Sequence, residues 1–222
     1  MFEMLYTKLF LKIKVVGIDA AGISAVNYML GKNMQGIRFY VFAEDISAAK
    51  NFKDHRFLKT EENNFLKSIG TADLIFIVGN ENFDKGLLKN SGASVIKIPA
   101  NKDNFEEFAY KLVKNFVEIF TLPGYPKIDF PKIYEVAGNF VGFAEGATSI
   151  GAMKNVIHAT ENFSGAKQIL FNVTTSAGNF SCEDAEEIVT FLNRLAPSAE
   201  ISFGCSIDNF IGDEAKIILI AQ

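Results

Sequence analysis

Four short apolar segments without polar alternation place the strongest constraint on how this chain folds. Each is rich in β-branched and aromatic side chains, and polar or helix-forming residues separate it from the next; the segments are residues 12–18, 38–43, 73–78 and 93–98. Strands of this kind are typical of a parallel sheet that helices cover on both faces. The first hundred residues therefore predict an α/β fold with a doubly wound, mostly parallel sheet.

A long amphipathic helix follows this sheet. Over residues 105–120, apolar side chains recur with the i, i+3, i+4, i+7 spacing of a helix that buries one face. The stripe consists of Phe105, Phe108, Ala109, Leu112, Val113, Phe116, Val117 and Phe120. Because proline cannot continue a helix, Pro123 marks its end. We place a domain boundary here, with a first domain over residues 1–121 and a second over residues 122–222.

The second half of the chain alternates strands and helices in a way that indicates a smaller α+β domain. Strand-like segments occupy residues 140–145, 168–174, 201–207 and 215–221. One helix is expected over residues 149–160, and another begins at a capping box formed by Ser181 and Asp184. A short connection containing Gly212 joins the last two strands, which predicts an antiparallel or mixed sheet.

The composition excludes several classes of protein. The chain has 222 residues with 22 Lys+Arg and 26 Asp+Glu, and its net charge of −4 argues against binding to nucleic acid. No apolar run reaches the ~20 residues of a membrane span, and the first residues do not resemble a signal peptide. Cys182 and Cys205 are too few for a disulfide framework. We therefore expect a cytoplasmic protein with no nucleic-acid partner.

The residues that could bind a metal or act as a nucleophile lack suitable neighbours in the sequence. His55 and His158 have no Cys, His or acidic residue at the spacing of a metal site. Cys182 falls in the first turn of a helix, but no His lies near it in the sequence to activate the thiol. An acidic corner could hold a cation, although a solvated turn is the simpler interpretation; it consists of Asp208, Asp213 and Glu214. We expect no metal.

Motifs in both halves of the chain form an ordered set. They read VVGIDAAGISAVNYM at residues 15–29, QGIRF at 35–39, PG at 123–124, IDF at 128–130, SGAKQILFNVT at 164–174, AEEIV at 185–189 and FGCSIDNFIGDE at 203–214. This set resembles the FtsZ/tubulin-like family, bacterial cell-division GTPases of the cytoskeleton, over residues 12–45 and 122–221. The resemblance implies a nucleotide-binding domain, a long central helix and a smaller domain that carries a catalytic loop.

The resemblance also implies a GTP site built on glycine loops, whose backbone N–H groups approach the phosphates. In the family the first loop is almost all glycine, whereas this chain reads DAAGI at residues 19–23 and keeps only Gly17 and Gly22. Side chains stand where the backbone must come close, and the Asp19 carboxylate would face phosphate oxygens. We interpret Gly17 and Gly22 as vestigial cofactor-binding residues.

Two other parts of the family's GTPase machinery are also altered. The glycine-rich phosphate loop is replaced by GNENFDKG at residues 79–86, which is typical of a polar loop. The family supplies an Asn and two acids to the GTP of the next subunit, and the matching positions here are Lys127, Asp129 and Lys132. Asp129 lies just before Pro131, where an acid is more typical of a helix N-cap than of a catalyst. We expect no catalytic residue, and hence a pseudo-GTPase.

These losses predict a structural or regulatory FtsZ-like protein that has lost GTP hydrolysis and GTP binding. We expect no cofactor, and we expect the partner to be the protein itself or an FtsZ-type protein. The residues expected to make this contact are Phe83, Lys127, Asp129, Phe130 and Lys132. Lys127 and Lys132 present positive charge where the family presents polar or acidic groups, which favours an acidic partner face.

Two alternatives remain open. The first is GTP or GDP binding with weak residual GTPase activity through Gly17, Gly22 and Asp129. The second is a module that binds another small ligand in the cleft at the topological switch point of the sheet. The sequence ends at Gln222, directly after the last strand. We therefore expect no tail of the kind by which FtsZ relatives dock membrane anchors, and no direct membrane anchor.

Overall fold

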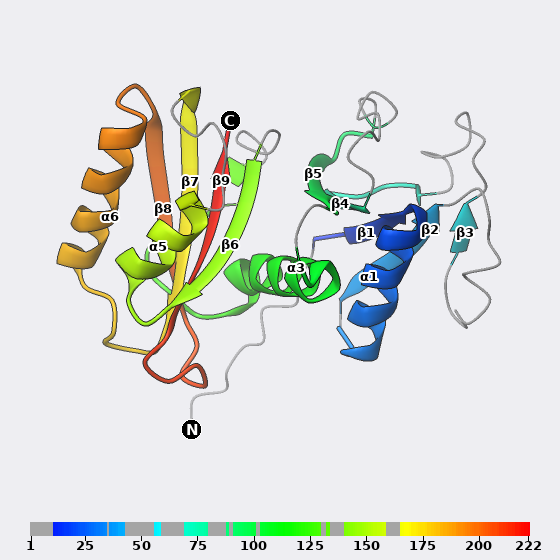
Figure 1. The fold of residues 1–222 in the computed structure, drawn as a ribbon, viewed down its shortest axis with the longest axis horizontal. Coiled ribbons are helices and arrows are strands. Elements are labelled where there is room, and N and C mark those ends of the chain that lie inside the picture. Colours follow the sequence, from blue (N-terminus) through cyan, green and yellow to red (C-terminus); the bar gives the residue numbers. More distant parts are fainter. Residues whose placement is uncertain are drawn as a thin grey trace. The chain divides into compact units, whose positions relative to one another are not determined.

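The computed structural model describes residues 11–34, 36–42, 56–58, 69–79, 88, 91–100, 103–129, 132–133, 140–158 and 165–222. The chain consists of two compact units, divided within one helix between Lys114 and Asn115. We call them the N-terminal unit and the C-terminal unit, and Figure 1 labels their helices and strands. The boundary predicted after residue 121 lies at the end of the same helix and stays a prediction.

The N-terminal unit is built on a five-stranded sheet in which every pair of neighbouring strands is parallel. In the order β3-β2-β1-β4-β5, the strands are Arg56–Leu58, Ile37–Phe42, Ile13–Ile18, Leu74–Gly79 and Ser94–Pro99. Every residue of the central strands β1 and β4 is buried, which explains their continuously apolar sequences. The charged residue in β1, Lys14, donates a hydrogen bond from its ammonium group to the carbonyl of Ile69. The predicted parallel α/β sheet is confirmed.

Both faces of β1 are covered. Helix α1 (Asp19–Gly31) packs on one face, where a Cβ built on Gly17 would lie 2.9 Å from Cγ2 of Val26. Successive strand residues point to opposite faces, so Val16 and Ile18 point away from α1. They join a buried cluster on the other face, which also contains Tyr40, Ile69, Ala72, Ile75, Ile77 and Leu88.

Helix α3 (Phe105–Thr121) is the long amphipathic helix predicted from the spacing of its apolar residues. Its buried positions are Phe105, Ala109, Leu112, Val113, Asn115, Phe116 and Ile119. Two contacts tie the start of α3 to α1 within the N-terminal unit. Ser24 Oγ donates a 2.7 Å hydrogen bond to Glu106 Oε1, and the rings of Tyr28 and Tyr110 meet edge to face with centroids 5.8 Å apart.

The C-terminal unit contains a four-stranded mixed sheet. In the order β6-β9-β7-β8, its strands are Phe140–Gly146, Ala215–Ala221, Gln168–Thr175 and Glu200–Ile207. Strands β7 and β8 are parallel, whereas β9 is antiparallel to both β6 and β7. The predicted mixed sheet is therefore confirmed, and its last two strands along the chain, β8 and β9, are separated by β7.

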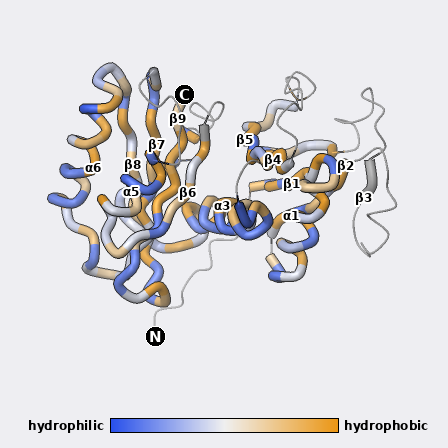
Figure 2. The backbone as a smooth tube through the Cα atoms, in the orientation of Figure 1, coloured by the Kyte–Doolittle hydropathy of each residue, from blue (hydrophilic) through white to orange (hydrophobic). Residues whose placement is uncertain are grey.

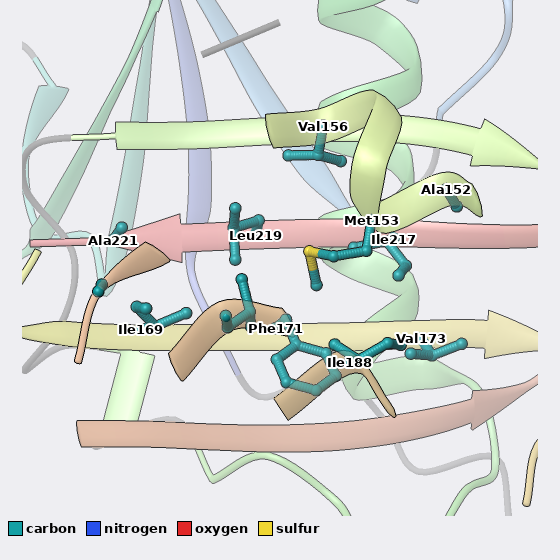
Figure 3. Packing of buried hydrophobic residues seen from close by; sticks show 12 residues of the cluster. Ala152, Met153, Val156, Ile169, Phe171, Val173, Ile188, Ile217, Leu219 and Ala221 are labelled. Atoms are coloured by element: carbon teal, nitrogen blue, oxygen red, sulfur yellow. The ribbon is translucent and has the colours of Figure 1, made fainter. Parts of the chain in front are cut away.

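Helices α5 (Ser149–His158) and α6 (Cys182–Leu195) cover one face of this sheet (Figure 1). Figure 3 shows the core between them and the strands, with Met153 of α5 pointing toward β9 and β7. The buried members of this core are Ala152, Met153, Val156, Ile169, Phe171, Val173, Ile188, Leu192, Ala196, Ile217, Leu219 and Ala221. In Figure 2 these strands are largely hydrophobic, while α6 carries hydrophilic residues among hydrophobic ones along its length.

The start of α6 shows the predicted capping box. The backbone N–H of Asp184 donates to Ser181 Oγ at 3.2 Å, and the backbone N–H of Ser181 donates to Asp184 Oδ2 at 2.8 Å. These two bonds satisfy donors that the helix itself leaves unpaired. Among the helices that the structure describes, none is long and apolar enough to cross a membrane.

Candidate functional site

Three glycines meet where β1, α1 and β4 come together. A Cβ built on Gly17 would lie 2.4 Å from the carbonyl oxygen of Gly22, and one built on Gly22 would lie 2.2 Å from that of Val78. At Gly79, which has a φ of +120°, a Cβ would lie 2.2 Å from the carbonyl oxygen of Ile18. Side-chain atoms do not tolerate such distances, so these positions require glycine for close packing of backbone on backbone. In the direction where a side chain would project, Gly17 and Gly22 meet the protein's own backbone.

The turn from β1 into α1 is made by Asp19. This residue has a φ of +58°, in the left-handed region that glycine adopts most easily. Its side chain is exposed at the first position of α1, and the N-cap residue Ile18 supplies no side-chain hydrogen bond to the helix. A carboxylate in the first turn interacts favourably with the positive end of the helix dipole. It also repels any other anion at this end of α1.

Two of the predicted contact residues, Phe83 and Phe130, lie outside the described residues, as does most of the polar loop over residues 79–86. The other three predicted contact residues lie in one stretch of the C-terminal unit. Lys127, Asp129 and Lys132 are all exposed.

An extended segment, residues 123–129, runs along the outer edge of β8. The backbone N–H of Ile207 donates to the carbonyl of Pro123 at 2.7 Å, and that of Cys205 donates to the carbonyl of Pro126 at 2.9 Å. Gly124 between these prolines allows the close approach, because a Cβ there would lie 1.9 Å from the carbonyl oxygen of Cys205. We call residues 123–129 the edge segment.

Alternating side chains of the edge segment fix it to the sheet and project from it. Ile128 is buried and contacts the backbone of Gly204, where an added Cβ would lie 2.7 Å from Ile128 Cγ1. The flanking residues Lys127 and Asp129 are exposed. The backbone N–H of Lys132 donates to the carbonyl of Asp129 at 3.1 Å.

Lys132 lies close to the start of β8. Its Nζ is 3.6 Å from Oε1 of Glu200, the first residue of that strand, and both side chains are about half exposed. Such a pair is worth at most about 1 kcal/mol in water. The structure thus places Lys127, Asp129 and Lys132 along a single edge of the sheet, with a carboxylate next to the last of them.

Two aromatic residues near the other end of β8 were not singled out from the sequence. Tyr125 in the edge segment is 90% exposed, and Phe210 in the turn after β8 is 99% exposed. That turn is well fixed: the N–H of Phe210 donates to Asp208 Oδ1 at 3.1 Å, and the N–H of Ala177 donates to Asn209 Oδ1 at 3.0 Å. The sequence signals are weak, namely a tyrosine between two prolines and a phenylalanine inside a polar turn.

The remaining candidate residues do not form a site. Cys205 is buried in β8, and burial raises the pKa of its thiol, which disfavours the reactive thiolate. Cys182 and His158 are exposed and lie on different helices. Across the part of the chain that the structure describes, no cluster of His, Cys, Asp and Glu could hold a metal ion.

Comparison with known proteins gives a consistent result. No protein-family model matches the sequence. Cell division protein FtsZ 1 of Halobacterium salinarum is 28% identical over 160 residues, which cover 67% of this chain and 39% of that protein. FtsZ of Mycoplasmopsis pulmonis is 21% identical over 297 residues, covering 94% of this chain and 76% of that protein. The second alignment is longer than this chain, so that relative has segments without a counterpart here.

Solved structures show the same likeness in three dimensions. The FtsZ dimer of M. jannaschii matches with a TM-score of 0.70 at 18% identity, covering 95% of this chain and 88% of that chain. CetZ from Methanosaeta thermophila matches with a TM-score of 0.67 at 9% identity, covering 95% and 86%. The chain spans about two fifths of the H. salinarum relative that it matches in sequence. The chain therefore has an FtsZ/tubulin-like fold and resembles FtsZ proteins in sequence.

Proposed function

We propose that this chain is a structural or regulatory FtsZ-like protein that acts through self-association or through contact with FtsZ-type filaments. The observation that carries the proposal is the surface beside the end of β8, where Tyr125 and Phe210 are almost fully exposed. Aromatic side chains bury large apolar areas and are enriched at protein contacts. Lys127, Asp129 and Lys132 continue the same edge and supply charges that select the partner.

The proposal includes the loss of GTP hydrolysis and of tight GTP binding. The exposed Asp19 carboxylate at the start of α1, where it would repel a phosphate, supports the loss of binding. Lysines at positions 127 and 132 support the loss of hydrolysis, because an ammonium group cannot accept a proton from an attacking water. Contacts made without nucleotide depend only on side-chain surfaces, so association is expected to be insensitive to GTP.

Light scattering on nucleotide-stripped protein, with and without GTP, tests this proposal. If the chain associates with itself, we expect its average molar mass to rise with protein concentration equally with and without GTP. If it binds FtsZ-type filaments, we expect it to co-sediment with filaments of a purified FtsZ whether or not this chain has been preincubated with nucleotide. Melting temperatures are expected to be equal with and without GTP, because a ligand stabilises only the state that binds it. Polymers that form only after GTP is added, or a GTP-dependent rise in melting temperature, would instead support a residual GTPase.

Substitutions locate the contact surface. The double variant Tyr125→Ser with Phe210→Ser is expected to reduce self-association or co-sedimentation, because it removes the two exposed aromatic side chains without disturbing the core. Lys167→Ser is the matched control, since Lys167 is also exposed but precedes the start of β7, at the opposite end of the sheet. Equal association of the double variant and the control would contradict the assignment of this surface.

A further inference from the structure

A second surface lies on the helical side of the C-terminal unit. A groove of about 620 Å³ runs between α5 and α6, the two helices that cover the sheet (Figure 1). It is lined by Ile150 and Lys154 of α5 and by Glu183, Glu186, Glu187, Thr190, Phe191 and Arg194 of α6. We call it the α5–α6 groove. Five of its eight lining residues are charged, and Phe191 and Ile150 give it an apolar floor that also packs on the core.

The charges of α6 are separated along the helix. Acidic residues occupy its first half, and the basic residue of its last turn is Arg194. The positions three and four residues before Arg194 are Phe191 and Thr190, so no carboxylate is available for an ion pair within the helix. Among the described residues, neither Glu187 nor Arg194 has an ion pair or a side-chain hydrogen bond.

Helical geometry places these opposite charges on one stripe. Glu187 and Arg194 are seven residues apart, which is close to two turns and about 10.5 Å along the axis. Glu183 and Thr190 fall on the same stripe. The buried positions of α6, Ala185, Ile188 and Leu192, lie on the opposite side of the helix. The charged stripe therefore points away from the sheet and is available to another molecule.

We propose that the occupant of this surface is a second copy of the chain, packed with its α6 antiparallel to the first. A two-fold axis between Thr190 and Phe191 brings Glu187 of each copy opposite Arg194 of the other. The same operation places Thr190 against Phe191 of the second copy. An isologous contact of this kind needs a self-complementary surface, and acid at one end with base at the other provides it.

This contact goes beyond the proposed function, because it uses α6 on one face of the sheet and not the edge segment along β8. A two-fold contact closes at a dimer, whereas head-to-tail association continues. Helix α6 has 14 residues and is about 21 Å long, so the interface stays below the roughly 1,200 Å² of stable complexes. We therefore expect a weak dimer that loses affinity as salt rises, because exposed ion pairs are screened.

Sedimentation of the full chain with two charge-reversal variants tests the pairing. In Glu187→Arg both stripe positions become basic, and in Arg194→Glu both become acidic, so each variant alone repels its own copies. Each is expected to lose at least about tenfold in the dimer association constant. Mixed in equal amounts, the two variants are expected to form a heterodimer, since every Arg then faces a Glu. The swap variant carrying both changes is expected to dimerise like the unmodified chain.

Matched controls change the net charge equally but lie outside the groove: Lys167→Glu for Arg194→Glu, and Glu214→Arg for Glu187→Arg. Both control residues are exposed, and both variants are expected to dimerise normally. A second series repeats each measurement in proteins that also carry Tyr125→Ser and Phe210→Ser. Dimerisation through α6 is expected to persist in this series, so failure of the edge contact is distinguished from failure of the α6 contact. A chain that remains monomeric at millimolar concentration, or variants that show no recovery on mixing, would overturn the proposal.

Discussion

The backbone of Gly22 lies against the carbonyl of Val78, where a Cβ would be only 2.2 Å from the oxygen. Neither atom belongs to a flexible side chain, so a larger residue can be accommodated only by moving α1 away from β4. Gly22→Ala is therefore expected to lower the free energy of unfolding by about 2–3 kcal/mol, as overpacking of a tight core does. Urea denaturation followed by circular dichroism measures this change.

Gly31 in the same helix provides the control. A Cβ at Gly31 meets no atom within 4 Å. Gly31→Ala is expected to leave stability unchanged or to raise it by about 0.5–1 kcal/mol, because alanine loses less conformational freedom on folding. If the two alanine variants were equally stable, close packing would not be the reason for glycine at position 22.

Asp19 tests the backbone of the turn into α1. Its φ of +58° suits Gly, Asn and Asp but is a steric outlier for a β-branched side chain. Asp19→Val is expected to cost about 1–2 kcal/mol in the free energy of unfolding. Asp19→Asn, which keeps the conformation and loses the charge, is expected to cost under about 1 kcal/mol. A valine variant as stable as the asparagine variant would show that the turn relaxes without strain.

The hydrogen bond between Ser24 and Glu106 predicts a dependence of stability on pH. The Ser24 hydroxyl, followed by the residue's own backbone N–H, lowers the pKa of Glu106 below its ordinary value. A carboxyl with a lowered folded-state pKa stabilises the fold above its unfolded pKa, and this contribution is lost as pH falls through the folded value. Ser24→Ala is therefore expected to be less stable than the unmodified chain at pH 7, by under about 1 kcal/mol for so exposed a group.

The same comparison in acid supplies the control for this effect. As the pH falls through the pKa of Glu106 its carboxyl becomes protonated in both proteins, so the charge-assisted part of the bond disappears. The difference in unfolding free energy between the two proteins is expected to shrink there. A difference that stays constant from neutral pH to acid would assign the effect to the serine alone.

The two cysteines are expected to react at very different rates. Cys182 is exposed at the start of α6, whereas Cys205 is buried in β8 with a pKa raised by that burial. A chromogenic disulfide reagent is expected to modify one thiol per folded chain quickly and the second only on unfolding. Cys182→Ser is expected to abolish the fast phase. Rapid modification of two thiols in the folded chain would contradict the burial of Cys205.

Local patterns predicted the elements of this fold well. The continuous apolar runs predicted β1 and β4, because both strands are buried on both faces. The helical spacing of apolar residues predicted α3, because one face of that helix is buried. The capping box at Ser181 was also readable, since its two hydrogen bonds join residues three apart. Each of these signals depends only on neighbours in the sequence.

Contacts between distant residues could not be predicted in the same way. The edge segment pairs with β8 through a backbone hydrogen bond from Cys205 to Pro126, which are far apart in the sequence. No local sequence pattern predicts this pairing. The exposure of Tyr125 and Phe210 follows from that pairing and from the turn after β8, so it too became visible only in three dimensions. Gly17 and Gly22 were linked to a cofactor by resemblance, which stays a prediction, and the structure adds their role in packing α1 on the sheet.

The edge segment has a consequence for how molecules of this protein can and cannot join. An open strand edge offers unpaired N–H and C=O groups that recruit strands from other chains, which is a common route to aggregation. Here the N–H groups of Cys205 and Ile207 already donate to the carbonyls of Pro126 and Pro123. These two groups near the end of β8 are therefore not available to pair with the backbone of another chain. If molecules associate here as proposed, the contact depends on side chains such as Tyr125 and Phe210, which single substitutions can adjust.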